Sequence, residues 1–204
     1  NTYTIAALVR MAGGEPLLLG VARDSTDDLR SKLASVPSPD LYVTSGGVSL
    51  GDYDMVKDVL RGEGRVDIWQ VRMKPGKPLA FGHVGETPLL GLPGNPVAAL
   101  VSFVQFGRAA IRSMLGHPGV RPREVEATLT ESLTNPGRRR HYVRGVFSTS
   151  SDGYEVRPTG DQGAAILTAV VRGNCFIVVP ETCDNVEAGM RVVIQPFDGL
   201  LRQE

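Results

Sequence analysis

Three polar loops that directly follow short apolar runs constrain this chain more than any other feature. They span residues 44–54 (TSGGVSLGDYD), 73–78 (MKPGKP) and 91–96 (GLPGNP). Short apolar runs bounded by glycine and proline are typical of buried strands, and α/β sheets bind their ligands at the carboxyl ends of such strands. The loops combine bare glycine backbone, two lysines and several aspartates. Together they predict a pocket for an anionic ligand.

Residues 1–118 alternate between helical and strand-like patterns. Helices are expected over 2–12, 25–34, 54–60 and 96–115, and strands over 16–22, 41–44, 66–73, 79–81 and 88–92. Ser25 or Thr26 can cap the second helix, and Asn95 with Pro96 suits the start of the last one. The alternation predicts an α/β domain with an open, mostly parallel sheet and helices on both faces.

Residues 119–204 have a different pattern. Strand-like runs are expected over 124–133, 142–148, 154–158, 175–180 and 191–195, with one helix over 164–171. Glycine, proline, asparagine and aspartate separate these runs. The pattern predicts a small all-β domain, either a barrel or a sandwich, that follows the α/β domain.

The charge balance limits the partners of the chain. Lysine and arginine number 22, and aspartate and glutamate also number 22, so no overall field favours nucleic acid or an anionic membrane. Any anion site must therefore be local. No apolar run is long enough to span a bilayer, and the two cysteines fit a reducing compartment. We expect a cytoplasmic protein with small-molecule substrates and no nucleic-acid or membrane partner.

The first loop has the residue types of an oxyanion and metal site. Two glycines after a strand allow a sharp turn and expose main-chain N–H groups that can hold phosphate, and serine hydroxyls add donors. The candidate binding residues are Ser45, Gly46, Gly47, Ser49, Gly51 and Asp52. Asp54 in the same loop and Asp24 after the preceding strand could hold a divalent cation beside the anion. The alternative is a loop with glycine for geometry and aspartate for helix capping.

The second loop carries two ammonium groups on a turn that prolines stiffen. Lys74 and Lys77 lie three residues apart and are separated by Pro75 and Gly76. A shared anion would relieve their mild repulsion, and proline reduces the entropy lost when the loop orders around that anion. The alternative is a solvated basic turn.

The third loop opens a helix, whose N-terminus has partial positive charge and free N–H groups. Its candidate binding residues are Pro93, Gly94, Asn95 and Pro96, and the alternative is simple capping by Asn95. In the second domain, residues 138–141 (RRRH) form the densest positive patch, and Arg144 follows just beyond it. Arginine forks suit oxyanions such as phosphate or molybdate, whereas the alternative is an exposed hairpin tip.

A resemblance to the molybdopterin molybdenumtransferases is carried by TSGGVSLGDYDMVK, MKPGKPLAFG and GLPGNPVAAL, in this order and spacing. These enzymes are the bacterial MoeA proteins and their relatives, including the E domain of gephyrin. The likeness extends to YVRG at 142–145, DQG at 161–163 and VEAG at 186–189, so it covers essentially the whole chain. It implies a MogA-like molybdopterin-binding domain over residues 1–118 and the family's C-terminal β domain over residues 119–204.

The resemblance implies the last step of molybdenum cofactor synthesis. In that reaction, molybdate and adenylylated molybdopterin give molybdenum cofactor and AMP, with Mg2+ as the divalent cation. Asp24 and Asp54 match positions associated with the magnesium and the diphosphate, and Lys74 and Lys77 match lysines near the dithiolene and molybdate. Arg139 matches an arginine that the β domain contributes. We therefore take Asp24, Asp54, Lys74 and Lys77 as candidate catalytic residues, and Asp24 and Asp54 as candidate metal ligands.

The sequence also departs from the family. Ala98 and Ala164 stand where the family often has serines that help to hold molybdate. The family's strand ending in Thr-Gly-Asp-Glu and its two N-terminal domains, which supply much of a homodimer interface, do not occur in the sequence. We expect residues 1–204 alone to have no turnover. The alternatives are a non-catalytic pterin-binding or scaffold protein like gephyrin, and an enzyme like the competence-damage CinA proteins, which the second loop, the third loop and the β domain disfavour.

Overall fold

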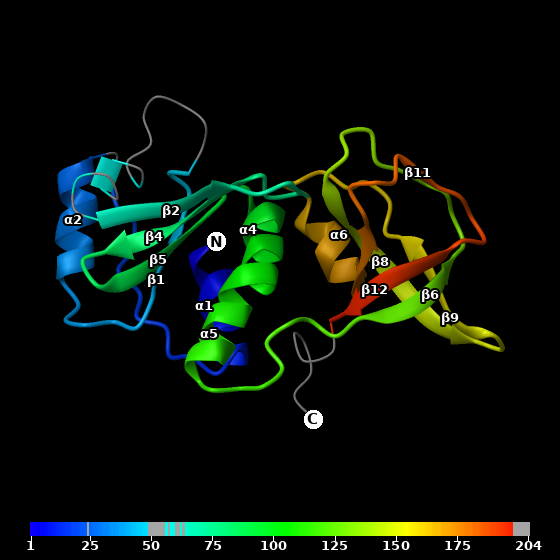
Figure 1. The fold of residues 1–204 in the computed structure, drawn as a ribbon, viewed down its shortest axis with the longest axis horizontal. Helices are drawn as coiled ribbons and strands as arrows, with labels where there is room; N and C mark the ends of the chain where they lie inside the picture. Colours follow the sequence, from blue (N-terminus) through cyan, green and yellow to red (C-terminus); the bar gives the residue numbers. More distant parts are fainter. Residues whose placement is uncertain (24, 49–55, 57, 60–61, 63, 198–204) are drawn as a thin grey trace. The chain divides into compact units, whose positions relative to one another are not determined.

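The chain folds into two compact units, which are described separately (Figure 1). Unit 1 contains residues 1–71 and 76–119, and unit 2 contains residues 72–75 and 120–204. The computed structural model describes residues 1–23, 25–48, 56, 58–59, 62 and 64–197. Within this described part, no helix is long and apolar enough to cross a membrane.

Unit 1 is built on a four-stranded sheet in the order β1-β5-β4-β2. Its strands are β1 (Tyr42–Ser45), β2 (Gly64–Gln70), β4 (Pro78–Val84) and β5 (Thr87–Leu92). β1 and β5 are parallel, whereas the β5–β4 and β4–β2 pairs are antiparallel. The sheet is therefore mixed, and the expectation of a mostly parallel sheet is wrong for the described strands. The reason is the two-residue connection between β4 and β5, because a turn this short can join only antiparallel neighbours.

Helices pack on both faces of this sheet. They are α1 (Thr2–Met11), α2 (Thr26–Ala34), α4 (Pro96–Ser102), the π-helical segment η1 (Phe103–Gly107) and α5 (Arg108–Met114). Leu29 and Leu33 of α2 pack in one core cluster with Leu89 of β5, while α4 contacts β5 as well. Four successive residues of β5, 89–92, are buried, and this is typical of a strand covered on both sides. The predicted helices over 2–12 and 25–34 are confirmed, and Ser25 caps α2 by accepting a hydrogen bond from the Asp28 N–H at 3.1 Å.

The strand expected over residues 16–22 is absent from the structure. The segment has an apolar strand composition, but Leu17, Leu18 and Val21 are exposed and it pairs with no described strand. Within the described part of the sheet, β1 is an edge strand that pairs with β5 alone. The segment and β1 both line a cavity of about 730 Å³. Residues with strand propensity become a strand only when a neighbour accepts and donates their main-chain hydrogen bonds.

Unit 2 is a closed sheet, so the barrel alternative is confirmed. The ring runs β10-β12-β6-β9-β8 and closes through a β8–β10 pairing. The short strand β3 pairs in parallel with the first two residues of β8. The strands are β3 (Met73–Lys74), β6 (Val125–Leu129), β8 (Arg140–Ser150), β9 (Gly153–Pro158), β10 (Cys175–Val179) and β12 (Arg191–Pro196). A β7–β11 pair (Leu133–Thr134 and Asn185–Val186) and helix α6 (Leu167–Arg172) complete the unit. Its core includes Leu129, Val143, Ile177 and Ile194.

The packing around Gly91 gives a test of the unit 1 core. A Cβ at this position would lie 2.6 Å from Val48 Cγ1 and 2.9 Å from Ala80 Cβ, and the latter cannot move without the backbone. We expect Gly91→Ala to lower the free energy of unfolding of unit 1 by about 1–3 kcal/mol, the usual cost of overpacking. Urea unfolding followed by the fluorescence of Trp69, the single tryptophan, measures this change.

Gly119→Ala is the matched control. A Cβ there meets nothing within 4 Å, and the φ angle is not in the left-handed region, so we expect a change within about 0.5 kcal/mol. Equal stability of the two variants would contradict the packing described for Gly91.

Candidate functional site

The first and third loops lie side by side at the carboxyl edge of the unit 1 sheet. β1 and β5 run in the same direction, and their last residues, Ser45 and Leu92, are opposite each other. The Gly46 N–H donates to the Leu92 carbonyl at 2.9 Å, and Ser45 Oγ donates to the Pro93 carbonyl at 3.2 Å. A Cβ on Gly94 would lie only 3.7 Å from Gly46 Cα. The structure thus brings the candidates Ser45, Gly46 and Gly47 next to Pro93 and Gly94.

Asn95 and Pro96 begin the long helix at this same edge. Asn95 occupies the N-cap position of α4, but its exposed side chain makes no capping hydrogen bond, and Pro96 is in the first turn. The helical path continues through η1 and α5 to Met114. The alternative interpretation, in which the Asn95 side chain caps the helix, is therefore not what the structure shows. The N–H groups of the first helical turn have no intrahelical partner and favour an anion.

Five of the candidate residues lie outside the part of the chain that the structure describes. They are Asp24, Ser49, Gly51, Asp52 and Asp54. Among the described residues, no group of three His, Cys, Asp or Glu side chains is arranged to hold a metal ion. The assignment of Mg2+ thus depends on Asp24 and Asp54 and stays a prediction.

The lysine loop is shared by the two units. Gly76 and the exposed Lys77 belong to unit 1, where the Lys77 carbonyl accepts a hydrogen bond from the Val71 N–H at 3.1 Å. Lys74 and Pro75 belong to unit 2, because β3 pairs in parallel with β8. The sequence places both lysines before the boundary at residue 118, and only the β3–β8 pairing shows that they are in different units.

Lys74 and Arg139 are part of a cationic group in unit 2 that surrounds a histidine. His141 is paired in register with Lys74 and is only 3% exposed. Burial, and then the charges of Lys74, Arg144 and Arg139, lowers the pKa of His141 to about 4, so the imidazole is neutral at pH 7. Neither of its ring nitrogens has a hydrogen-bond partner among the described residues. The sequence places His141 in the positive patch of residues 138–141, but His141 was not selected as a site residue.

Arg139 is the arginine of residues 138–140 that has no side-chain partner in the described structure. Arg138 forms an ion pair with Asp184 at 3.1 Å, and Arg140 interacts with Tyr142. The loop that carries them is held by the buried Asn135, whose Nδ2 donates to the Arg139 carbonyl at 2.9 Å. The unit therefore leaves one half-buried guanidinium of this run available for an anion.

Arg144, which the sequence places just beyond the positive patch, is a second residue that was not selected as a site residue. Its guanidinium is completely buried, and the loss of hydration lowers its pKa to about 10. Its Nη2 donates to the Gly163 carbonyl at 3.1 Å, and its main-chain N–H donates to Gln162 Oε1 at 2.8 Å. Arg144 thus fixes the 161–163 loop that precedes Ala164. Its signals in the sequence are a charge in the middle of an apolar strand and a position next to the positive patch.

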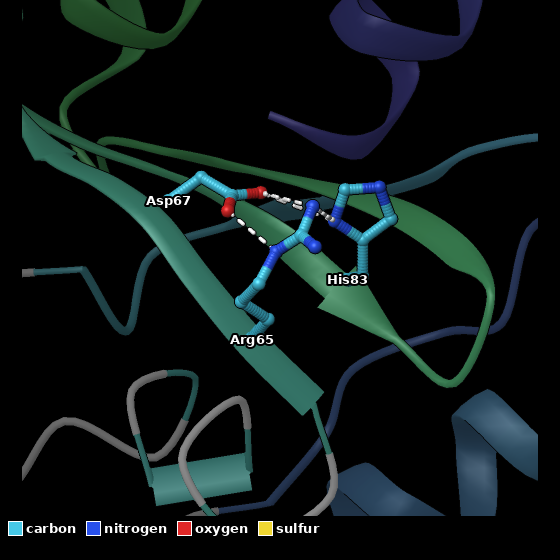
Figure 2. Close-up of polar contacts among 3 residues, drawn as sticks. All are labelled: Arg65, Asp67 and His83. Carbon is cyan, nitrogen blue, oxygen red and sulfur yellow. Dashed lines mark hydrogen bonds and ion pairs between the residues drawn. The ribbon is translucent and has the colours of Figure 1, made fainter.

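A polar cluster of Arg65, Asp67 and His83 connects β2 and β4 (Figure 2). The Asp67 carboxylate accepts from Arg65 Nε at 2.6 Å and contacts His83 Nδ1 at 3.1 Å. The hydrogen bond from Arg65 is the largest of the effects that lower the pKa of Asp67. These strands are on the opposite side of the sheet order from β1, and the cluster contains no nucleophile. We interpret it as a cross-strand contact that stabilises the sheet.

Comparison with known proteins identifies the class to which this architecture belongs. Residues 1–113 match the family described as "Probable molybdopterin binding domain", so the chain belongs to that family. Residues 126–197 match the MoeA C-terminal region, domain IV. These matches confirm the resemblance found in the sequence.

Individual relatives agree with the family match. The chain is 37% identical to "Molybdopterin molybdenumtransferase" of Haemophilus influenzae over 204 residues, which cover 98% of this chain and 50% of the relative. It is 33% identical to the Nostoc protein of the same name, covering 95% of this chain and 46% of that protein. A solved molybdopterin biosynthesis MoeA protein from Pyrococcus horikoshii superposes with a TM-score of 0.80 at 26% identity, covering 97% of this chain and 47% of that chain. The chain spans about half the length of the curated relatives it matches.

The buried histidine of unit 2 predicts a pH effect on stability. The pKa of His141 is about 4 in the folded state and about 6.5 in the unfolded state, so between these values the unfolded state binds more protons. Above pH 6.5 His141 is neutral in both states and does not lower the free energy of unfolding. As the pH falls from 6.5 toward 4, the free energy of unfolding decreases by about 3 kcal/mol. Scanning calorimetry from pH 4 to 7 should show this loss in the native chain and a flatter profile in His141→Gln.

His117→Gln serves as the control, because His117 is exposed. Its pH profile should follow that of the native chain. A His141→Gln profile that also follows the native one would contradict the burial of a neutral imidazole.

Proposed function

We propose that this chain is part of a molybdopterin molybdenumtransferase, which inserts molybdate into adenylylated molybdopterin and releases AMP. The observation that carries the proposal is the paired carboxyl ends of β1 and β5, where two glycine loops and a helix N-terminus meet. That edge suits a phosphate or diphosphate. The relatives named for this activity match both units of the chain.

In this proposal, unit 1 binds the phosphate end of the pterin nucleotide. Gly47 and Gly94 would contribute main-chain N–H groups, the first turn of α4 would contribute its dipole, and the exposed Lys77 would add positive charge. Ser49, Gly51 and Asp52 belong to the same proposed subsite. Asp24 and Asp54 would hold Mg2+, which polarises the diphosphate when it is bound.

Unit 2 contributes positive charge for an oxyanion. Lys74 and Arg139 have no ion-pair partner among the described residues, and His141 next to them remains neutral. A dianion such as molybdate would satisfy both cations. The substrates of the proposed reaction are both anions, so the main task of these residues is to hold the anions in position and to offset their repulsion.

We also propose that one further strand, from outside residues 1–204, lies parallel to β1 in the cavity of unit 1. Residues 16–22 and the free edge of β1 both lack a strand partner in the described structure, and the curated relatives are about twice as long. Such a strand would give the sheet the parallel, MogA-like layout that the resemblance implies. In this account, the assembled protein is a cytoplasmic homodimer.

The direct test is molybdate-dependent release of AMP from adenylylated molybdopterin by the full-length protein. We expect release that requires both molybdate and Mg2+ and that Lys77→Ala reduces. Tight binding of the pterin nucleotide without any release of AMP would instead support the non-catalytic scaffold, for which Ala98 and Ala164 are the sequence argument.

The oxyanion role of unit 2 gives a binding prediction for residues 1–204. We expect Lys74→Ala and Arg139→Ala each to weaken the binding of molybdate by about tenfold, because each removes one charge-assisted contact. Isothermal titration calorimetry with sodium molybdate measures the effect.

Arg172→Ala is the control, since Arg172 is an exposed cation of the same unit without an ion-pair partner in the described structure. It should leave the affinity unchanged. An equal loss of molybdate affinity in all three variants would show that binding depends on the overall charge of unit 2 and not on a site at Lys74 and Arg139.

A further inference from the structure

The side chain of Asn1 connects the two loops at the edge of unit 1. Its Nδ2 lies 2.7 Å from Ser45 Oγ and 2.8 Å from the Gly94 carbonyl oxygen. Because a carbonyl only accepts hydrogen bonds, the atom facing Gly94 must be the amide nitrogen. An amide nitrogen has two hydrogens, so one is available for each loop.

The same contacts determine where the hydrogen of the Ser45 hydroxyl points. Ser45 Oγ accepts from Asn1 and donates to the Pro93 carbonyl at 3.2 Å. A hydroxyl has a single hydrogen, and this one is used. What remains on Ser45 Oγ is a lone pair, which repels an anion. Ser45 is therefore poorly suited to donate to a phosphate, although its residue type suggests that role.

We propose that Asn1 and Ser45 are positioning residues that fix the spacing of the β1 loop and the β5–α4 loop, while main-chain N–H groups hold the anion. The Gly46 N–H is already bonded to the Leu92 carbonyl. In the described structure, the N–H groups of Gly47 and Gly94 have no partner, and they belong to the two loops that Asn1 connects. The proposal rests on the proposed function only for the identity of the anion.

A double-mutant cycle with Asn1→Ala and Ser45→Ala separates positioning from direct binding. The probe is ADP with Mg2+, titrated calorimetrically into residues 1–204. We expect each single variant to weaken ADP binding by about fivefold. The double variant should lose no more affinity than the single variant with the larger loss, because both changes break the same connection between the two loops. Effects that multiply in the double variant, or a loss in Ser45→Ala alone, would make Ser45 a direct donor and overturn the proposal.

A measurement without ligand keeps the proposal testable if ADP does not bind. Amide hydrogen exchange at Gly46 should accelerate to a similar extent in Asn1→Ala, in Ser45→Ala and in the double variant. Accelerated exchange without ADP binding would uphold the positioning role and count against the proposed function. Unchanged exchange in either single variant would overturn the positioning role itself.

Thr4→Ala is the matched control, because Thr4 is an exposed residue of the same helix. It should change neither the affinity nor the exchange rate. Asn1→Asp keeps the shape of the side chain but cannot donate, so we expect it to behave like Asn1→Ala in the exchange measurement.

Discussion

The parallel pairing of β1 with β5 is the constraint on which the candidate site depends. Parallel neighbours end at the same edge of a sheet, so the loops that follow Ser45 and Leu92 begin next to each other although these residues are 47 positions apart in the sequence. The hydrogen bond from the Gly46 N–H to the Leu92 carbonyl extends this pairing into the loops. Antiparallel pairing of the same two strands would place the two glycine loops at opposite ends.

Unit 2 places several cations around a buried, neutral histidine. It keeps Lys74, Arg139 and Arg144 around one imidazole, and burial together with these charges holds that imidazole neutral. Arg144 is itself fully buried: its Nη2 donates to the Gly163 carbonyl, while its Nε and Nη1 have no partner among the described residues. The positive charge left for a ligand is therefore concentrated on Lys74 and Arg139.

Local signals were sufficient for the elements that depend on local interactions. The cap of α2 at Ser25 and the helix over residues 2–12 follow from capping chemistry and periodicity. Residues 16–22 were predicted wrongly, because strand formation requires a partner that the segment itself cannot encode. The mixed sheet was missed for a similar reason, since the short turn between β4 and β5 sets a direction that apolar content does not show.

The site was predictable as a set of loops but not as a set of hydrogen bonds. The sequence placed Ser45 among the ligand donors, whereas the structure uses its hydroxyl hydrogen for the Pro93 carbonyl. His141 and Arg144 were noted only as a positive patch and its flank, because their burial depends on β3 and on the 161–163 loop, which are distant in sequence. Asp24 and Asp54 lie outside the described residues, so their predicted roles stay predictions.

The most direct test of the account is a titration of the isotope-labelled chain with ADP and Mg2+, followed by the amide resonances of its backbone. The account predicts saturable shifts at Gly46, Gly47, Gly94 and Asn95, and constant resonances on α6 of unit 2. Shifts confined to the Arg65–Asp67–His83 cluster, or a titration without saturable shifts, would contradict the claim that the joined ends of β1 and β5 form the anion site.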